Sequence, residues 1–219
     1  MDNVFIVIPG LNEEKHIGSV IRRTKRAGFK EIIFVDDGSK DKSAEIAEKA
    51  GASVLTHAVN LGKGAAAKTG CDYALQENAD VIVLMDADGQ HNPEDIPRLL
   101  KALKGKDIVF SYRTLNKEMP FVYRFGNWFI NKSTETLFRI RLRDTQCGFR
   151  AMTRNAYRKI RWESIDYTME SEMISLSGKH KLKYKEIPIK TIYHDKYKGT
   201  SVLDGVKIFL NMVKFRVLR

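Results

Sequence analysis

The stretch VIVLMDADGQH, residues 81–91, joins an apolar run to two carboxylates and an amide. Residues 81–84 have the composition of a buried strand, and the polar residues stand where such a strand would break into a loop. Mg²⁺ and Mn²⁺ prefer oxygen ligands, and a site with two or three protein oxygens leaves positions for water and phosphate groups. We therefore take Asp86, Asp88 and Gln90 as candidate ligands of Mg²⁺ or Mn²⁺.

Other interpretations of this segment were weighed. An EF-hand loop beginning at Asp86 needs a Glu at its twelfth position, where this chain has Pro97. An aspartyl phosphotransferase would use one Asp as a nucleophile, which the segment permits. A plain turn also stays open, because Asp and Gly are common at strand ends.

Length and composition favour one α/β domain, or such a domain with an appended segment. The chain has 219 residues, of which 43% are hydrophobic. Cys71 and Cys147 lie far apart without a metal-binding pattern, so we expect neither a disulfide framework nor a zinc site. The sequence has no basic leader and no uncharged run of the ~18 residues that span a bilayer. We expect an intracellular protein that is not integral to the membrane.

The positive charge is concentrated in the second half of the chain. Of the net +11, residues 1–110 carry −2, from 15 Lys and Arg against 17 Asp and Glu, and residues 111–219 carry +13, from 23 against 10. Such asymmetry suggests nucleic acid, an anionic membrane surface or phosphorylated substrates as partners, and a merely solvated basic face is the alternative.

The first half alternates between two patterns. Apolar, β-branched runs at residues 4–8, 32–35, 53–55, 81–84 and 107–110 predict strands, and helical spacing at 13–27, 42–50, 65–77 and 93–103 predicts helices. This alternation indicates a mostly parallel sheet with helices on both faces. Ligands of such sheets bind beyond the carboxyl ends of the strands.

Those strand ends are acidic. Glu13 and Glu14 follow the first strand, Asp36 and Asp37 the second, and the D-x-D segment the fourth. A dinucleotide-binding loop would need G-x-G-x-x-G, which these strand ends lack. A P-loop would need G-x-x-x-x-G-K-[ST], and the Gly-Lys-Gly at 62–64 does not supply it. Carboxylates suit a ribose diol, a base edge and a metal instead, so we expect Asp37 to accept hydrogen bonds from uracil or guanine.

Five ordered motifs resemble the family 2 glycosyltransferases of the GT-A fold. They are VIPGLNEE at 7–14, VDDGS at 35–39, LGKGAA at 61–66, MDADGQH at 85–91 and DTQCGFR at 144–150. The resemblance is closest to the dolichol-phosphate mannose synthase and polyprenyl-phosphate glycosyltransferase group. The Q-x-x-R-W segment of polysaccharide-building members is absent, which favours a lipid-phosphate acceptor.

The resemblance implies roles for individual residues. Those implied to hold the nucleotide sugar are Pro9, Leu11, Glu13, Val35, Asp37, Asp86, Ala87, Asp88 and Lys198, and those implied to hold the metal are Asp86, Asp88 and Gln90. For Leu11 and Val35, packing at a strand end explains the residue equally well. Lys63 either contacts a phosphate or simply begins a helix.

Two arginines and an aspartate are the candidates for the acceptor side. Arg113 and Arg124 present donor forks matched to phosphate, and Arg124 stands in an aromatic stretch suited to a lipid tail or to helix packing. Asp144 would orient the acceptor, act as a base, or cap a turn. Glu172 either contacts sugar hydroxyls or lies on a solvated helix face.

The C-terminal part resembles the family's mobile loop, followed by an amphipathic basic helix. Residues 194–201 supply Lys196 and Lys198 for the diphosphate, although Val202 replaces the usual basic residue. Residues 201–219 would lie on an anionic membrane, with a membrane-protein partner as a possible anchor, or would pack on their own domain.

Together these features predict a metal-dependent, inverting transfer of a hexose, mannose or glucose, from a GDP- or UDP-linked sugar to polyprenyl or dolichyl phosphate. We expect it at the cytoplasmic membrane face, with a donor half at 1–112, an acceptor half at 113–200 and the surface helix at 201–219. The alternatives are another lipid or glycan acceptor and, from a different class, a nucleic-acid-binding protein. The latter lacks any recognisable module, so no nucleic acid is expected as a partner.

Overall fold

The computed structural model describes residues 3–114 and 132–190. Arg124, Lys198, the loop at 194–201 and the helix predicted at 201–219 lie outside the described residues. The elements follow in the order β1 (Val4–Gly10), α1 (Ile17–Arg26), β2 (Ile32–Asp36), α2 (Ser43–Ala50), β3 (Ser53–Thr56), α3 (Lys63–Gln76), β4 (Val81–Leu84), η1 (Pro93–Asp95), α4 (Ile96–Leu103), β5 (Ile108–Arg113), β6 (Arg150–Thr153), α6 (Arg154–Ile160), α7 (Met169–Lys179) and β7 (Tyr184–Ile189). Residues 132–138 are also helical.

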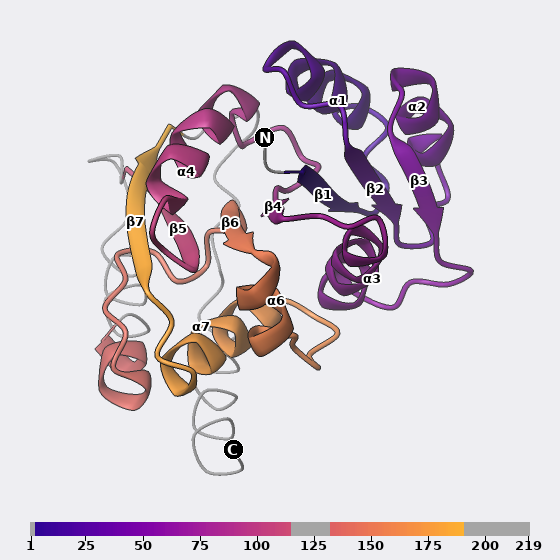
Figure 1. Cartoon of the computed structure of the whole chain (residues 1–219). Coiled ribbons are helices and arrows are strands. Elements are labelled where there is room, and N and C mark those ends of the chain that lie inside the picture. Colours follow the sequence, from indigo (N-terminus) through magenta and orange to yellow (C-terminus); the bar gives the residue numbers. More distant parts are fainter. Residues whose placement is uncertain (1–2, 115–131, 191–219) are drawn as a thin grey trace.

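The strands form one seven-stranded sheet in the order β3-β2-β1-β4-β6-β5-β7 (Figure 1). Its parallel pairs are β1 with β2 and β4, β2 with β3, and β5 with β7. Strand β6 runs antiparallel to both β4 and β5. The carboxyl ends of β1, β2, β4 and β5 therefore point the same way, and the loops that follow them share one edge of the sheet.

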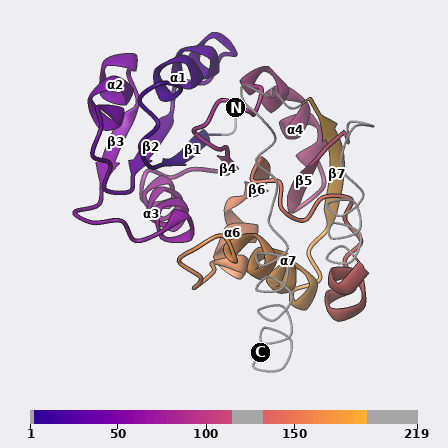
Figure 2. The ribbon, with the colours of Figure 1, turned by 180° about the vertical axis from the view of Figure 1, so that it is seen from behind.

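Helices cover both faces of the sheet, as predicted (Figures 1 and 2). Apolar residues of α1, α2 and α4 pack on one face, in a core that includes Ile8, Phe34 and Ile96. Residues of α3, α6 and α7 pack on the other face around Val35, Ile82 and Trp162. Because both faces are covered, the central strands bury nearly every side chain, which explains their unbroken apolar runs.

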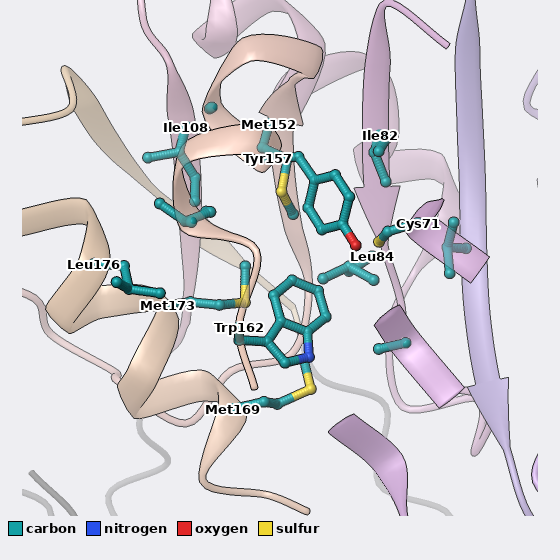
Figure 3. Packing of buried hydrophobic residues seen from close by; sticks show 14 of the residues in the cluster. Cys71, Ile82, Leu84, Ile108, Met152, Tyr157, Trp162, Met169, Met173 and Leu176 are labelled. Carbon is teal, nitrogen blue, oxygen red and sulfur yellow. The ribbon is translucent and has the colours of Figure 1, made fainter. Parts of the chain in front are cut away.

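The second core ties the segment after α6 to the start of α3. Trp162 is fully buried, and its ring packs edge-on against Tyr157 at 5.5 Å between centroids (Figure 3). Its indole N–H donates to the carbonyl of Gly64 at 2.8 Å, and the Tyr157 hydroxyl donates to Asp72 at 2.7 Å. These contacts set residues 163–168 over the beginning of α3.

Two predicted helix boundaries were wrong. The helix expected from residue 13 begins at Ile17, because the backbone N–H of Glu13 donates to the Ser43 hydroxyl at 2.7 Å and holds residues 13–16 in a turn. Helix α3 begins two residues earlier than expected, at Lys63, after Gly62 in a left-handed conformation (φ 102°). The earlier start brings Lys63 to the edge where the acidic loops meet.

Candidate active site

A cavity of about 330 Å³ opens at the carboxyl ends of β1, β2 and β4. Its lining consists of Pro9, Gly10, Leu11, Glu13, Asp37, Asn60, Gly62, Lys63, Ala66, Asp86, Ala87, Asp88 and Tyr167. Seven of the residues proposed to hold the nucleotide sugar are in that set. Four of the six acidic residues at the predicted strand ends, Glu13, Asp37, Asp86 and Asp88, therefore lie together in one place.

Two of the predicted contact residues do not line the cavity. Val35 is fully buried in the core, and a Cβ added at Gly70 would stand 2.9 Å from its side chain, so its side chain is closed to a ligand. Gln90 lies just beyond the cavity and donates its backbone N–H to Asp88 at 2.9 Å. In this geometry the backbone of Gln90 orients the Asp88 carboxylate.

Asp86 is held ionised by its neighbours. Its Oδ1 atom lies 2.8 Å from Lys63 Nζ, and its Oδ2 atom lies 3.8 Å from His91 Nε2. Burial alone would raise the pKa of Asp86, but the charges of Lys63, His91 and Arg113 outweigh burial and lower it to about 2. Gly148 leaves room for this carboxylate, because a Cβ there would lie 2.7 and 2.8 Å from its two oxygens.

Lys63 begins α3 and also reaches into the cavity. The glycines on either side of it permit a close approach, since a Cβ at Gly62 or Gly64 would stand 2.4 Å from a backbone oxygen of residues 164–165. Its ammonium lies 3.0 Å from Glu170 Oε1 and 5.5 Å from the ring centroid of Tyr167. Burial opposes the charge on Lys63, but Asp86 and Glu170 raise its pKa above the ordinary value.

Asp37 fixes the loop before α3. The backbone N–H groups of Leu61 and Gly62 donate to its two oxygens at 3.0 and 2.8 Å, and His57 Nδ1 lies 2.7 Å from Oδ1. His57 in turn contacts the Thr69 hydroxyl at 3.0 Å. A nucleotide base in the cavity would therefore meet an Asp37 that is already oriented, with Oδ2 accepting one bond.

Arg113 and Asp144, proposed separately for the acceptor, pair with each other. The Arg113 side chain donates from Nε and Nη2 to the two Asp144 oxygens at 2.7 and 3.1 Å. The backbone N–H groups of Arg113 and Gln146 donate to the same carboxylate. Asp144 thus fixes the Arg113 fork beside the end of β5.

The loop that carries Asp144 and Gly148 is fastened by a buried arginine. Arg150 is 1% exposed and donates to the carbonyls of Cys147, Thr145 and Glu170 at 2.9, 2.8 and 3.3 Å. Its guanidinium also stands 5.2 Å from the ring centroid of Phe110. Arg150 therefore ties this loop to the start of α7.

Of the two alternatives for Glu172, contact with sugar hydroxyls and a solvated helix face, the second was wrong. This residue is 1% exposed and accepts hydrogen bonds from the backbone N–H groups of Glu163 and Ser164 and from the Ser164 hydroxyl. Sequence reasoning missed its neighbour Glu170, the partner of Lys63. The sequence gives no pattern that would have found it, because 107 positions separate the pair.

The donor set suits a hard divalent cation. Asp86 and Asp88 contribute carboxylate oxygens to one cavity, and the low pKa of Asp86 keeps it in the ligating form. Within residues 3–114 and 132–190, no group of three or more His, Cys, Asp and Glu side chains forms a complete cage. Mg²⁺ is commonly bound by one or two protein carboxylates, and the phosphates of the substrate supply further ligands.

Comparison with known proteins identifies the family. The family model described as glycosyl transferase family 2 matches residues 5–161. The chain belongs to glycosyl transferase family 2. An uncharacterised protein of Methanocaldococcus jannaschii is 40% identical over 226 residues, covering 99% of this chain and 93% of the relative.

Two further comparisons concern a curated relative of this family 2 glycosyltransferase and a solved structure. A UDP-N-acetylglucosamine–dolichyl-phosphate N-acetylglucosaminyltransferase of Methanococcus voltae is 31% identical over 241 residues, covering 98% of this chain and 96% of the relative. The crystal structure of glucosyl-3-phosphoglycerate synthase from Mycobacterium tuberculosis with Mn²⁺, UDP and phosphoglyceric acid has a TM-score of 0.79 at 18% identity. It covers 99% of this chain and 79% of that protein, and confirms the GT-A type of fold.

None of the helices in the described part of this glycosyltransferase combines the length and apolarity needed to cross a lipid bilayer.

Proposed function

We propose that this glycosyltransferase moves a hexose from a nucleoside-diphosphate sugar to a polyprenyl or dolichyl phosphate, using a divalent cation on Asp86 and Asp88. The observation that carries the proposal is the cavity itself. It gathers Asp86, Asp88, Asp37 and Lys63 at the shared carboxyl edge of the sheet. A nucleoside diphosphate requires carboxylates that hold its cation, a positive charge near its phosphates and a hydrogen-bond acceptor for its nucleobase. These residues supply all three.

The relatives give more support for the choice of donor than the cavity does. The Methanococcus voltae relative is named for UDP-N-acetylglucosamine and dolichyl phosphate and is similar over nearly its whole length. This similarity supports a UDP-linked donor and adds N-acetylglucosamine to the mannose and glucose expected from sequence. Gln90 remains a proposed third metal ligand, and Lys198 a proposed diphosphate contact.

On the acceptor side, the pairing of Arg113 with Asp144 supports a role in positioning. A phosphate monoester has its second pKa near ~6, so it is already a nucleophile at neutral pH and needs no general base. Asp144 then holds the Arg113 fork in place, and Arg113 and Arg124 bind the acceptor phosphate. The acceptor oxygen attacks the anomeric carbon from the face opposite the departing diphosphate, which inverts the configuration.

The rate enhancement then comes from positioning and electrostatics. When bound, a divalent cation would neutralise charge that develops on the departing diphosphate. Lys63 adds a positive charge in the same cavity. Since a polyprenyl phosphate resides in a bilayer, we propose that the enzyme works at the cytoplasmic membrane surface, with residues 1–112 binding the donor, 113–200 the acceptor and 201–219 the membrane.

The test is a transfer assay with purified protein, polyprenyl phosphate, Mn²⁺ or Mg²⁺, and labelled UDP-N-acetylglucosamine, UDP-glucose and GDP-mannose in parallel. We expect label in the lipid fraction from at least one donor. Asp88→Asn should lower that labelling by ~100-fold, because it removes the negative charge of a proposed metal ligand. Asp80→Asn, an exposed aspartate before β4, is the matched control and should keep full activity.

Lipid labelling that survives Asp88→Asn would contradict the assignment of the metal. Label that appears only in a soluble glycan would replace the polyprenyl phosphate with another acceptor.

A further inference from the structure

The cavity carries far more negative charge than positive. Four carboxylates line it, those of Glu13, Asp37, Asp86 and Asp88. Among the described residues of the lining, Lys63 is the one with a positive charge. Such a surface repels an incoming diphosphate unless cations offset its charge, so the position of Lys63 affects how strongly the cavity attracts that ligand.

Lys63 is shared between two acids that differ in surroundings. Its ammonium lies 2.8 Å from Asp86 and 3.0 Å from Glu170. The Asp86 side chain is 25% exposed and lines the cavity, whereas the Glu170 side chain is 3% exposed and lies behind it. One partner is thus within reach of ligands, and the other is enclosed by protein.

Among the described residues, the direct ion pair of the Glu170 carboxylate is the one with Lys63, and the buried guanidinium of Arg150 acts on its charge without a direct ion pair. The second oxygen of Glu170, Oε2, is buried and has no hydrogen-bond partner within the described residues. A buried carboxylate in that state strongly favours keeping its one ammonium contact. The contact with Glu170 is therefore the more durable of the two that Lys63 makes.

The contact with Asp86 conflicts with metal binding. A divalent cation on Asp86 would lie within a few ångströms of the ammonium, and two positive charges at that range repel each other. The backbone on either side of Lys63 packs closely against residues 164–165, since a Cβ at Gly62 or Gly64 would stand 2.4 Å from one of their carbonyl oxygens. The repulsion is therefore relieved by a movement of the Lys63 side chain, which already faces the cavity.

We propose that Lys63 is a resident counter-cation positioned by Glu170. In the metal-free enzyme Lys63 neutralises Asp86; when the cation and the donor bind, it releases Asp86, stays tethered to Glu170 and binds a phosphate oxygen of the donor. The inference rests on the proposed function, because it requires a nucleoside-diphosphate donor in this cavity. Glu170 touches neither ligand and acts through Lys63.

The first measurement uses Mn²⁺ alone, titrated into nucleotide-free full-length protein and followed by the electron paramagnetic resonance of free Mn²⁺. Lys63→Met should bind Mn²⁺ about 10-fold more tightly than wild type, because no ammonium competes for Asp86. Glu170→Gln should bind it more weakly than wild type, because Lys63 then pairs with Asp86 alone. Lys68→Met, farther along α3 and outside the cavity, should match wild type.

The second measurement uses UDP and uridine, titrated calorimetrically in EDTA. Lys63→Met should weaken UDP binding about 10-fold, the value of one charge-assisted hydrogen bond. Uridine, which lacks phosphate, should bind equally to both proteins. A misfolded variant cannot bind Mn²⁺ more tightly and UDP more weakly at once, so the opposite directions exclude a merely structural effect.

An unchanged Mn²⁺ affinity in Lys63→Met, alongside normal UDP binding by wild type in Mn²⁺, would overturn this inference alone. Wild-type protein that binds no nucleoside diphosphate with or without metal would overturn the proposed function and this inference with it.

Discussion

Replacing Gly148 by alanine tests whether the position of Asp86 governs metal binding. The new Cβ would stand 2.7 Å from one Asp86 oxygen and 2.8 Å from the other, whereas ordinary contacts begin at 3.4 Å. Relief requires a shift of about 0.7 Å, from 2.7 to 3.4 Å. The three atoms nearest to this Cβ all belong to the carboxylate of Asp86, so the shift falls on that side chain and not on the backbone.

The expected effect on metal binding is large and the effect on stability small. Metal–oxygen distances are held within about 0.2 Å, so a displacement of this size takes the ligand out of range. Changes in the groups that orient metal ligands typically cost 10–100-fold in affinity, and we expect the same for Mn²⁺ with UDP. The free energy of unfolding should fall by only about 1 kcal/mol, because the end of a side chain can move.

The assay is calorimetric titration of UDP in the presence of Mn²⁺, alongside chemical denaturation of the same samples. Gly18→Ala is the matched control, because its Cβ would meet an Ile46 methyl at a similar 2.8 Å, in α1 and outside the cavity lining. It should leave UDP binding unchanged. Wild-type affinity in Gly148→Ala would refute the reasoning, since the carboxylate would then have tolerated its displacement.

Two further predictions concern the framework around the site. Arg150→Met should lower the free energy of unfolding by about 3 kcal/mol or more, because three buried carbonyls lose their hydrogen-bond donor and nearby carboxylates lose a positive charge. The measurement is unfolding in urea, with the exposed Arg158→Met as a control that should be as stable as wild type. Equal losses in the two variants would refute the role of Arg150. Burial would raise the pKa of Asp72, but hydrogen bonds from Arg161 and Tyr157 outweigh it and lower that pKa below its ordinary 3.8. Asp72 therefore contributes stability that is present above about pH 4 and is lost as the pH falls through its lowered pKa. In thermal melts over a pH series, the melting temperature of Asp72→Asn should fall less below pH 4 than that of wild type. Parallel falls in the two proteins would contradict the assignment.

The sequence predicted the structure best where a local residue pattern directly reflects the position of the segment in the fold. Strands β1, β2 and β4 are short β-branched runs because both faces of the sheet are covered, and that same rule places Asp37, Asp86 and Asp88 at one edge. The family motifs added the fold type. The predicted start of a helix was wrong where a side chain distant in sequence binds the backbone, as the Ser43 hydroxyl does at the turn before α1.

The elements after residue 113 escaped prediction for physical reasons. Helix α7 buries polar and apolar residues alike from Met169 to Ser177, so it shows no one-sided apolar stripe. Strand β7 contains Pro188, which is exposed, as is Lys185, and its buried apolar residues are Ile187 and Ile189 alone. A proline is tolerated here because β7 is an edge strand. The pairing of Lys63 with Glu170 depends on how these elements pack on α3, which no local pattern encodes.

The most direct test of the account is a calorimetric titration of the wild-type enzyme with UDP and with GDP, each in Mn²⁺ and in EDTA. The account predicts that at least one of the two nucleotides binds, and binds at least ~10-fold more tightly with the metal than without it, because Asp86 and Asp88 hold the cation that joins the diphosphate to the protein. Equal affinity in Mn²⁺ and in EDTA, or no binding of either nucleotide in either condition, would contradict it.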